Sequence, residues 1–166
     1  GDLFVVRVAG NVCAPSLVGS VEFAAATFGT ELVIVMGHSK CGAVDVTLAE
    51  LKKGRNAAMS SNIADIVERI RPAVYPLLEV DHEPTDLLRA AVRANVQHSV
   101  DHLRHASRVL EERIADGKLV VVGAEYELET GVVDFFDVPS AFKHRATSTR
   151  RLDAPESHRE AAPLSS

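Results

Sequence analysis

A histidine and a cysteine stand three residues apart in the segment GHSKCG, where His38 and Cys41 follow a short apolar run. The run, residues 32–36, is typical of a buried parallel strand. Gly37 ends it, and Gly42 opens a helical pattern. Zinc accepts imidazole and thiolate ligands, and a thiol near a helix N-terminus ionises more easily, so this pattern predicts a metal site. The spacing alone leaves a structural or incidental His-x-x-Cys as the alternative.

Other residues near this motif are candidates for the surroundings of the metal or for the substrate pocket. Asp45 could hydrogen-bond a metal ligand, and Ser39 and Gly42 adjoin the two ligand candidates. Solvated loop and helix positions are the alternative for Ser39 and Asp45. Phe23 could line a substrate pocket, with core packing on a helix as the alternative.

The chain has one further cysteine and a second pair of histidines. Cys13 is a small apolar residue of the core in one interpretation and a replacement zinc ligand in the other. His98 and His102 are four residues apart on a predicted helix, a spacing that can chelate a metal. Because no third ligand accompanies this pair in the sequence, solvated histidines on a helix surface are the favoured interpretation.

Composition excludes several classes of function. The 166 residues suit one domain, and 46% apolar content is enough for a sizeable core. A net charge of −5 argues against nucleic-acid binding as the main task. No run reaches the ~20 apolar residues of a membrane span, and the two cysteines make no disulfide framework. We therefore expect a cytoplasmic protein without nucleic-acid or membrane partners.

Strands and helices are predicted in alternation around the metal motif. Residues 3–8, LFVVRV, are β-branched and mostly apolar and predict a strand, with Arg7 reaching solvent. Ser16 is the candidate N-cap of a helix over residues 16–28. Gly29 is expected to end that helix in the left-handed conformation.

The remaining elements follow from periodicity and from the positions of proline and glycine. They are helices over 44–53 and 63–70, irregular or loop segments at 55–62, 75–83 and 125–130, a helical pattern over 85–116, and strands at 119–123 and 132–136. Gly54 and Pro72 are expected to end the first two helices. The pattern over 85–116 fits either one long helix or two with a bend. The last two strands are close in sequence and are expected to pair antiparallel.

Five segments occur in an order that is known from one protein family. They are VRVAGN (6–11), GSVEFAAATFGT (19–30), GHSKCGAV (37–44), ANVQHSVDHL (94–103) and VVGAEYELETGVVDFF (121–136). In this order they resemble the β-class carbonic anhydrases, over about residues 1–136. The resemblance implies that His38 and Cys41 are zinc ligands. It also implies an enzyme, a zinc lyase that reversibly hydrates carbon dioxide to bicarbonate and a proton, because zinc lowers the pKa of a bound water.

One motif of this family does not occur in the sequence. The family carries Cys-x-Asp-x-Arg at the end of a strand upstream of the VRVAGN-like segment and places that strand in the middle of its sheet. The motif supplies another zinc ligand and an Asp–Arg pair that governs the metal-bound water. We therefore expect an N-terminally incomplete domain with a gap in its sheet, weak zinc binding and poor carbon dioxide hydration by this chain alone. Its catalytic residues beyond the metal ligands are unknown.

These observations lead to one expected architecture and three functions. The expected fold is three-layer α/β, with a mainly parallel β-sheet flanked by helices and a C-terminal antiparallel strand, over residues 1–138. Residues 139–166 are expected to be a flexible tail. The resemblance implies a homo-oligomer, a dimer or a multiple of dimers, with residues 16–28 and 132–136 as candidate contacts. The alternatives to carbonic anhydrase are a non-catalytic assembly protein and a hydrolase of small molecules such as carbon disulfide.

Overall fold

The computed structural model describes residues 2–53, 59–79 and 83–139. The elements, in chain order, are the 3-10 helix η1 (Ala9–Asn11), α1 (Pro15–Phe28), β1 (Leu32–His38), α2 (Gly42–Lys53), α3 (Ser61–Val74), the 3-10 helix η2 (Tyr75–Glu79), α4 (Pro84–His105), α5 (Arg108–Ala115), β2 (Val120–Tyr126) and β3 (Val133–Asp137). This mixture of helices and a small mixed sheet confirms the predicted α/β class. Within the described ranges, no helix is long and apolar enough to cross a membrane.

The sheet has the order β1-β2-β3. β1 and β2 are parallel, and their register places His38 opposite Tyr126. The connection between them carries α2 to α5, as parallel pairing requires a long crossover. β3 pairs antiparallel with β2, which confirms the expectation for the last strand. The carboxyl end of β1, which bears His38, therefore lies beside the β2–β3 turn.

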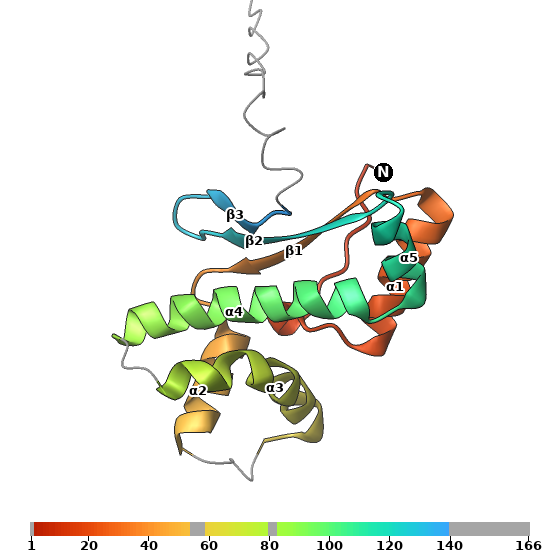
Figure 1. The fold of residues 1–166 in the computed structure, drawn as a ribbon. Helices are drawn as coiled ribbons and strands as arrows, with labels where there is room; N and C mark the ends of the chain where they lie inside the picture. Colours follow the sequence, from red (N-terminus) through yellow and green to blue (C-terminus); the bar gives the residue numbers. More distant parts are fainter. Residues whose placement is uncertain (1, 54–58, 80–82, 140–166) are drawn as a thin grey trace, which may run out of the picture.

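Helix α4 covers one face of the sheet because two glycines let it approach closely. A Cβ atom on Gly37 would lie 2.6 Å from Val96 Cγ2, and one on Gly123 would lie 3.2 Å from Val96 Cγ1. Figure 1 shows α4 lying along the sheet, with α2 and α3 on its far side. On the opposite face of β1, Ile34 and Met36 are exposed. Packing against α4 thus fixes the strand that ends in His38.

Two apolar clusters form the core, one on each side of α4. The first joins α1, α5 and the sheet to α4 and contains Val21, Val35, Val100 and Leu110. The second lies among α2, α3 and α4, and its members are Val12, Cys41, Val44, Leu48, Ile70, Val74, Leu87, Ala91 and Val92. The second cluster thereby includes one of the two predicted metal ligands.

The strand predicted over residues 3–8 is wrong. These residues are exposed and have no strand assignment, although their sequence is rich in β-branched residues. A strand needs a neighbour to accept its backbone hydrogen bonds, and in the described part of the chain nothing pairs with this segment. The outer edge of β1 is likewise unpaired there, so the expected gap is present as an open sheet edge. Arg7 is exposed, as expected.

Several helix boundaries also differ from the predictions. The residue before α1 is Ala14, and Pro15 begins the helix, so Ser16 is not the N-cap. Proline suits the first helical position because its missing N–H would have no partner there. Gly29 ends α1 with φ +66°, as predicted. α3 does not stop at Pro72 but continues through it to Val74.

The second half of the chain resolves one alternative and corrects two further predictions. The helical pattern over 85–116 is two helices, because Ser107 breaks it and caps α5 by accepting the Leu110 N–H. Part of the segment predicted as irregular is the 3-10 helix η2. β2 extends to Tyr126, beyond the predicted end. Gly54, residues 55–58 of the predicted loop 55–62 and all but the first residue of the predicted tail lie outside the described residues.

Candidate metal centre

His38 is the last residue of β1, and a hydrogen bond defines its imidazole ring. Its Nδ1 lies 2.9 Å from the carbonyl oxygen of Ser39. A carbonyl oxygen can only accept, so Nδ1 must carry the proton in this contact. This contact leaves Nε2 as the ring nitrogen that could bind a metal, which requires the neutral form of the imidazole. The hydrogen bond therefore orients the ring and leaves Nε2 without a bond to the Ser39 carbonyl.

A tight turn carries the chain from His38 to Cys41. Lys40 has φ +56°, in the left-handed region, which reverses the chain within two residues. Cys41 is buried, and its carbonyl accepts the Asp45 N–H at 3.0 Å, the first bond of the helix. α2 begins at Gly42, as predicted. The Cys41 side chain thus stands immediately before the N-terminus of α2.

The turn is bonded to the hairpin turn between β2 and β3. Ser39 Oγ donates to Glu127 Oε1 at 2.7 Å and accepts the Leu128 backbone N–H at 3.0 Å. The residues involved are 88 and 89 positions apart, and no sequence spacing connects them. Sequence reasoning therefore placed Ser39 near the metal but missed Glu127; the only available signal was that a charged turn follows a buried strand.

A bend in the VRVAGN segment (6–11) lies next to the first turn of α2, which follows Cys41. Asn95 of α4 donates to the Gly10 carbonyl at 2.7 Å, and Ser99 Oγ donates to the Asn11 carbonyl at 2.9 Å. Gly10 has φ +65°, and a Cβ on it would lie 3.2 Å from Ala43 Cβ in the first turn of α2. The buried Asn95 and Ser99 therefore hold this bend against the start of the helix that follows Cys41.

Two other predicted site residues point to the surface. Asp45 is exposed on the first turn of α2. Phe23 is exposed rather than buried in the core, and its ring lies 5.6 Å from the Phe28 ring and 6.4 Å from the Phe4 ring, between centroids. These three aromatic residues form an exposed aromatic cluster on α1 and the segment before it.

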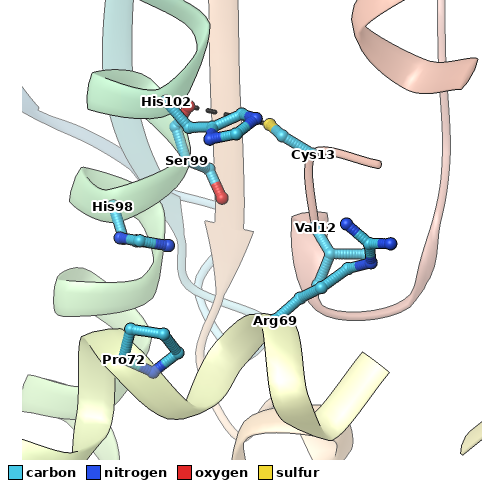
Figure 2. A pocket seen from close by; sticks show the side chains of 7 residues that line it. All are labelled: Val12, Cys13, Arg69, Pro72, His98, Ser99 and His102. Carbon is cyan, nitrogen blue, oxygen red and sulfur yellow. Dashed lines mark hydrogen bonds between the residues drawn. The ribbon is translucent and has the colours of Figure 1, made fainter. Parts of the chain in front are cut away.

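Cys13 belongs to a different cavity from the His38–Cys41 turn. The cavity has a volume of about 130 Å³ and is lined by Val12, Cys13, Arg69, Pro72, His98, Ser99 and His102. Figure 2 shows the imidazole of His102 beside Cys13 and that of His98 further along the same helix. Cys13 Sγ donates to the Ser99 carbonyl at 3.6 Å. Burial, the main cause, raises the pKa of the Cys13 thiol, which disfavours the thiolate that a metal requires.

The donor set at the turn fits zinc in part. His38 offers a free Nε2 and Cys41 a thiol, which are two of the ligand types that zinc prefers. Within residues 2–53, 59–79 and 83–139, however, no group of three or more His, Cys, Asp or Glu side chains is arranged to hold a metal ion. The described residues thus supply two donors at this turn, and a catalytic zinc site normally needs three.

Known proteins match this chain over most of its length. The family model for carbonic anhydrase matches residues 1–133. Carbonic anhydrase 2 of Mycobacterium tuberculosis is 35% identical over 131 residues, which cover 79% of this chain and 61% of the relative. The carbonic anhydrase of Mycolicibacterium smegmatis is 34% identical over 134 residues, covering 81% of this chain and 63% of the relative.

A solved structure agrees with these sequence matches. The β-carbonic anhydrase CcaA has a TM-score of 0.66 and 26% identity to this chain, covering 84% of it and 68% of that structure. The chain spans less than two thirds of the length of the two mycobacterial relatives. The His38–Cys41 turn and the bend at Asn11 both lie inside the matched residues. The chain therefore belongs to the β-carbonic anhydrase family.

Proposed function

We propose that the protein of which this chain is all or part interconverts carbon dioxide and bicarbonate, and that His38 and Cys41 are two of its zinc ligands. The observation that carries this proposal is the turn itself. Its histidine presents Nε2 because Nδ1 is bonded to the Ser39 carbonyl, and its cysteine begins a helix. Family membership supports the assignment. When bound, zinc supplies a water molecule of lowered pKa, able to react as a nucleophile near neutral pH.

We expect the remaining cysteine ligand and the Asp–Arg pair of the family to come from a segment outside the described residues. Three observations support this expectation: the incomplete donor set, the unpaired outer edge of β1 and the unpaired residues 3–8. A strand between residues 3–8 and β1 would satisfy the backbone groups of both. The full-length relatives, of which this chain spans 61% and 63%, leave room for such a segment.

The proposal includes assembly into a dimer or a multiple of dimers in the reducing cytoplasm. Phe23 and Phe28 of α1 are 53% and 64% exposed, and Val132 and Phe135 at the last strand are 60% and 48% exposed. Apolar surfaces of this kind commonly mark contacts between proteins. Both cysteines are free thiols, which suits a reducing compartment. A monomer in light scattering at micromolar concentration would contradict the assembly.

The test measures zinc content after dialysis and carbon dioxide hydration by stopped flow, for this chain and for Cys41→Ser. We expect weak zinc binding and slow hydration by the chain alone, because only two donors hold the metal. Stoichiometric zinc with fast hydration would show that another residue of this chain completes the site. Zinc content that Cys41→Ser leaves unchanged would remove the His38–Cys41 turn from the proposal.

One observation favours a second candidate function, a non-catalytic assembly protein. The described residues hold no third ligand, while the exposed aromatic cluster is available for contacts. The upstream reading frame separates the two candidates. A Cys-x-Asp-x-Arg segment there favours the enzyme, and its absence favours the assembly protein. Carbon disulfide hydrolysis, measured beside carbon dioxide hydration, tests the related hydrolase on the same fold.

A further inference from the structure

Ser39 is held from three sides, although it is not itself a candidate metal ligand. Its backbone N–H donates to the Tyr126 carbonyl at 3.0 Å, and its own carbonyl accepts from His38 Nδ1 at 2.9 Å. Its hydroxyl donates to Glu127 Oε1 and accepts the Leu128 N–H. The carbonyl that orients the His38 ring therefore belongs to a residue that is fixed by the β2–β3 turn.

Glu127 is in turn fixed by its own hairpin. Its backbone N–H donates to the Val132 carbonyl at 2.8 Å, and its carbonyl accepts the Gly131 N–H at 2.8 Å. Its Oε1 also accepts the Glu129 N–H at 3.2 Å. The Ser39 hydroxyl, followed by this backbone bond, lowers the pKa of Glu127. Glu127 is therefore ionised at neutral pH and is a strong acceptor for the Ser39 hydroxyl.

A second interaction joins the same two turns but is of a different kind. Lys40 Nζ forms an ion pair with Glu129, and the two side chains are 67% and 69% exposed. Exposed ion pairs contribute little, because water and salt screen them. The Glu129 carboxylate contacts Lys40, whereas the Ser39 hydroxyl contacts Glu127 and Leu128. The chain thus contains a matched control for Glu127, two residues away in the same turn.

We propose that Glu127 is a positioning residue for the metal centre, acting through Ser39 to hold the His38 ring and the Cys41 thiol in one arrangement. This inference rests on the proposed function, in which His38 and Cys41 bind the metal. The ring is oriented by the Ser39 carbonyl, and Cys41 follows Ser39 by two residues in the same tight turn. Mutating a group that orients a metal ligand typically lowers metal affinity about 10- to 100-fold.

The experiment uses the full 166-residue chain and four variants. Ser39→Ala and Glu127→Gln remove or weaken the contact, Ser39→Thr retains the hydroxyl, and Glu129→Gln is the control. Co²⁺ titration followed by visible absorption measures metal affinity, and ¹⁵N NMR of the metal-free protein measures the His38 tautomer. Urea denaturation of each variant measures stability separately.

We expect Ser39→Ala and Glu127→Gln to weaken Co²⁺ binding about 10-fold or more and to mix the His38 tautomers. Ser39→Thr and Glu129→Gln should match the unmodified chain in both measurements. The inference is overturned if Ser39→Ala and Glu127→Gln lower only the stability, or if Glu129→Gln has the same effect on binding. If the unmodified chain binds no Co²⁺, the two donors of the His38–Cys41 turn do not hold a metal by themselves, which counts against the proposed site in this chain. The tautomer measurement then decides separately whether Glu127 positions His38.

Discussion

Histidine and cysteine side chains meet in two regions of this molecule, and the two regions differ in how the backbone presents them. At the His38–Cys41 turn, the histidine ends a strand and the cysteine begins a helix. At the Cys13 cavity, the cysteine lies in a loop and both histidines lie on the exposed side of α4. At the His38–Cys41 turn, the strand end and the helix start therefore fix the backbone of both residues close together. At the Cys13 cavity, the histidines and the cysteine lie on separate segments, and both imidazoles are exposed.

The electrostatic surroundings differ as well. The Cys13 thiol donates its proton to a carbonyl, and burial raises its pKa. Arg69 lines the same cavity, and although it is bonded to Asp65, its charge opposes a bound cation. Cys41 stands instead at a helix N-terminus. Histidine and cysteine residues alone therefore do not predict a metal site, because the backbone position of each side chain and, at Cys13, the raised pKa of the thiol also bear on metal binding.

The largest expected effect contrasts one histidine from each region. His38→Ala removes a donor, so we expect Co²⁺ affinity to fall by more than the roughly 100-fold that loss of a supporting partner can cost. His102→Ala should leave the affinity unchanged, because a protonated thiol and an arginine accompany it. Isothermal titration of both variants checks this. A loss of Co²⁺ binding in His102→Ala would show that the Cys13 cavity is a metal site.

The next effect concerns the packing that fixes the end of β1. Gly37→Ala places a Cβ 2.6 Å from Val96, so we expect a loss of about 3 kcal/mol in the free energy of unfolding. Gly19→Ala is the control, because a Cβ there meets nothing within 4 Å and alanine favours a helix interior by roughly 1 kcal/mol. Urea denaturation measures both. Equal stability in the two variants would mean that α4 can move away from β1.

The sequence predicted the local elements better than their ends. Apolar runs and their order were sufficient for β1, β2 and β3, and Gly29 was identified as a helix end because its missing side chain permits a positive φ. The helix end predicted at Pro72 is wrong. α3 continues to Val74, because the buried Val67, Ile70 and Val74 stabilise the helix on both sides of the proline. Propensity is a weak guide where packing is strong.

Long-range partners account for the rest of the differences. Residues 3–8 have a strand-like composition, but pairing needs a neighbour that composition cannot reveal. His38, Cys41 and Ser39 were found because they are adjacent in sequence. Glu127 was missed because only the parallel register of β1 and β2 brings it to Ser39. The residues of a site that come from distant segments thus require the fold to be known.

A smaller effect is expected at the bend around Gly10 and Asn11. Asn95→Ala removes the donor to the Gly10 carbonyl and leaves a buried acceptor unpaired, which costs about 2 kcal/mol of stability. Gln97→Ala on the same helix, which removes an amide that donates to the exposed Asp101, should change stability by less than about 0.5 kcal/mol. Thermal or urea unfolding compares the two. A neutral Asn95→Ala would show that the bend does not depend on this bond.

The smallest expected effect is a pH dependence at Cys13. Burial raises the folded-state pKa of this thiol above its ordinary value of 9.0, so the protonated form is favoured in the folded protein. The stability that this provides is fully present below pH 9.0 and is lost as the pH rises through the higher folded-state pKa. The free energy of unfolding should therefore decrease above pH 9.0 by less in Cys13→Ser than in the unmodified chain, which isolates this thiol from other groups that titrate there. Urea denaturation of both proteins at a series of pH values, from neutral to about 10.5, measures this difference in the free energy of unfolding. Parallel curves for the two proteins would mean that the Cys13 thiol titrates as it does in the unfolded chain, and would remove its protonated state as a reason why this cavity differs from the His38–Cys41 turn.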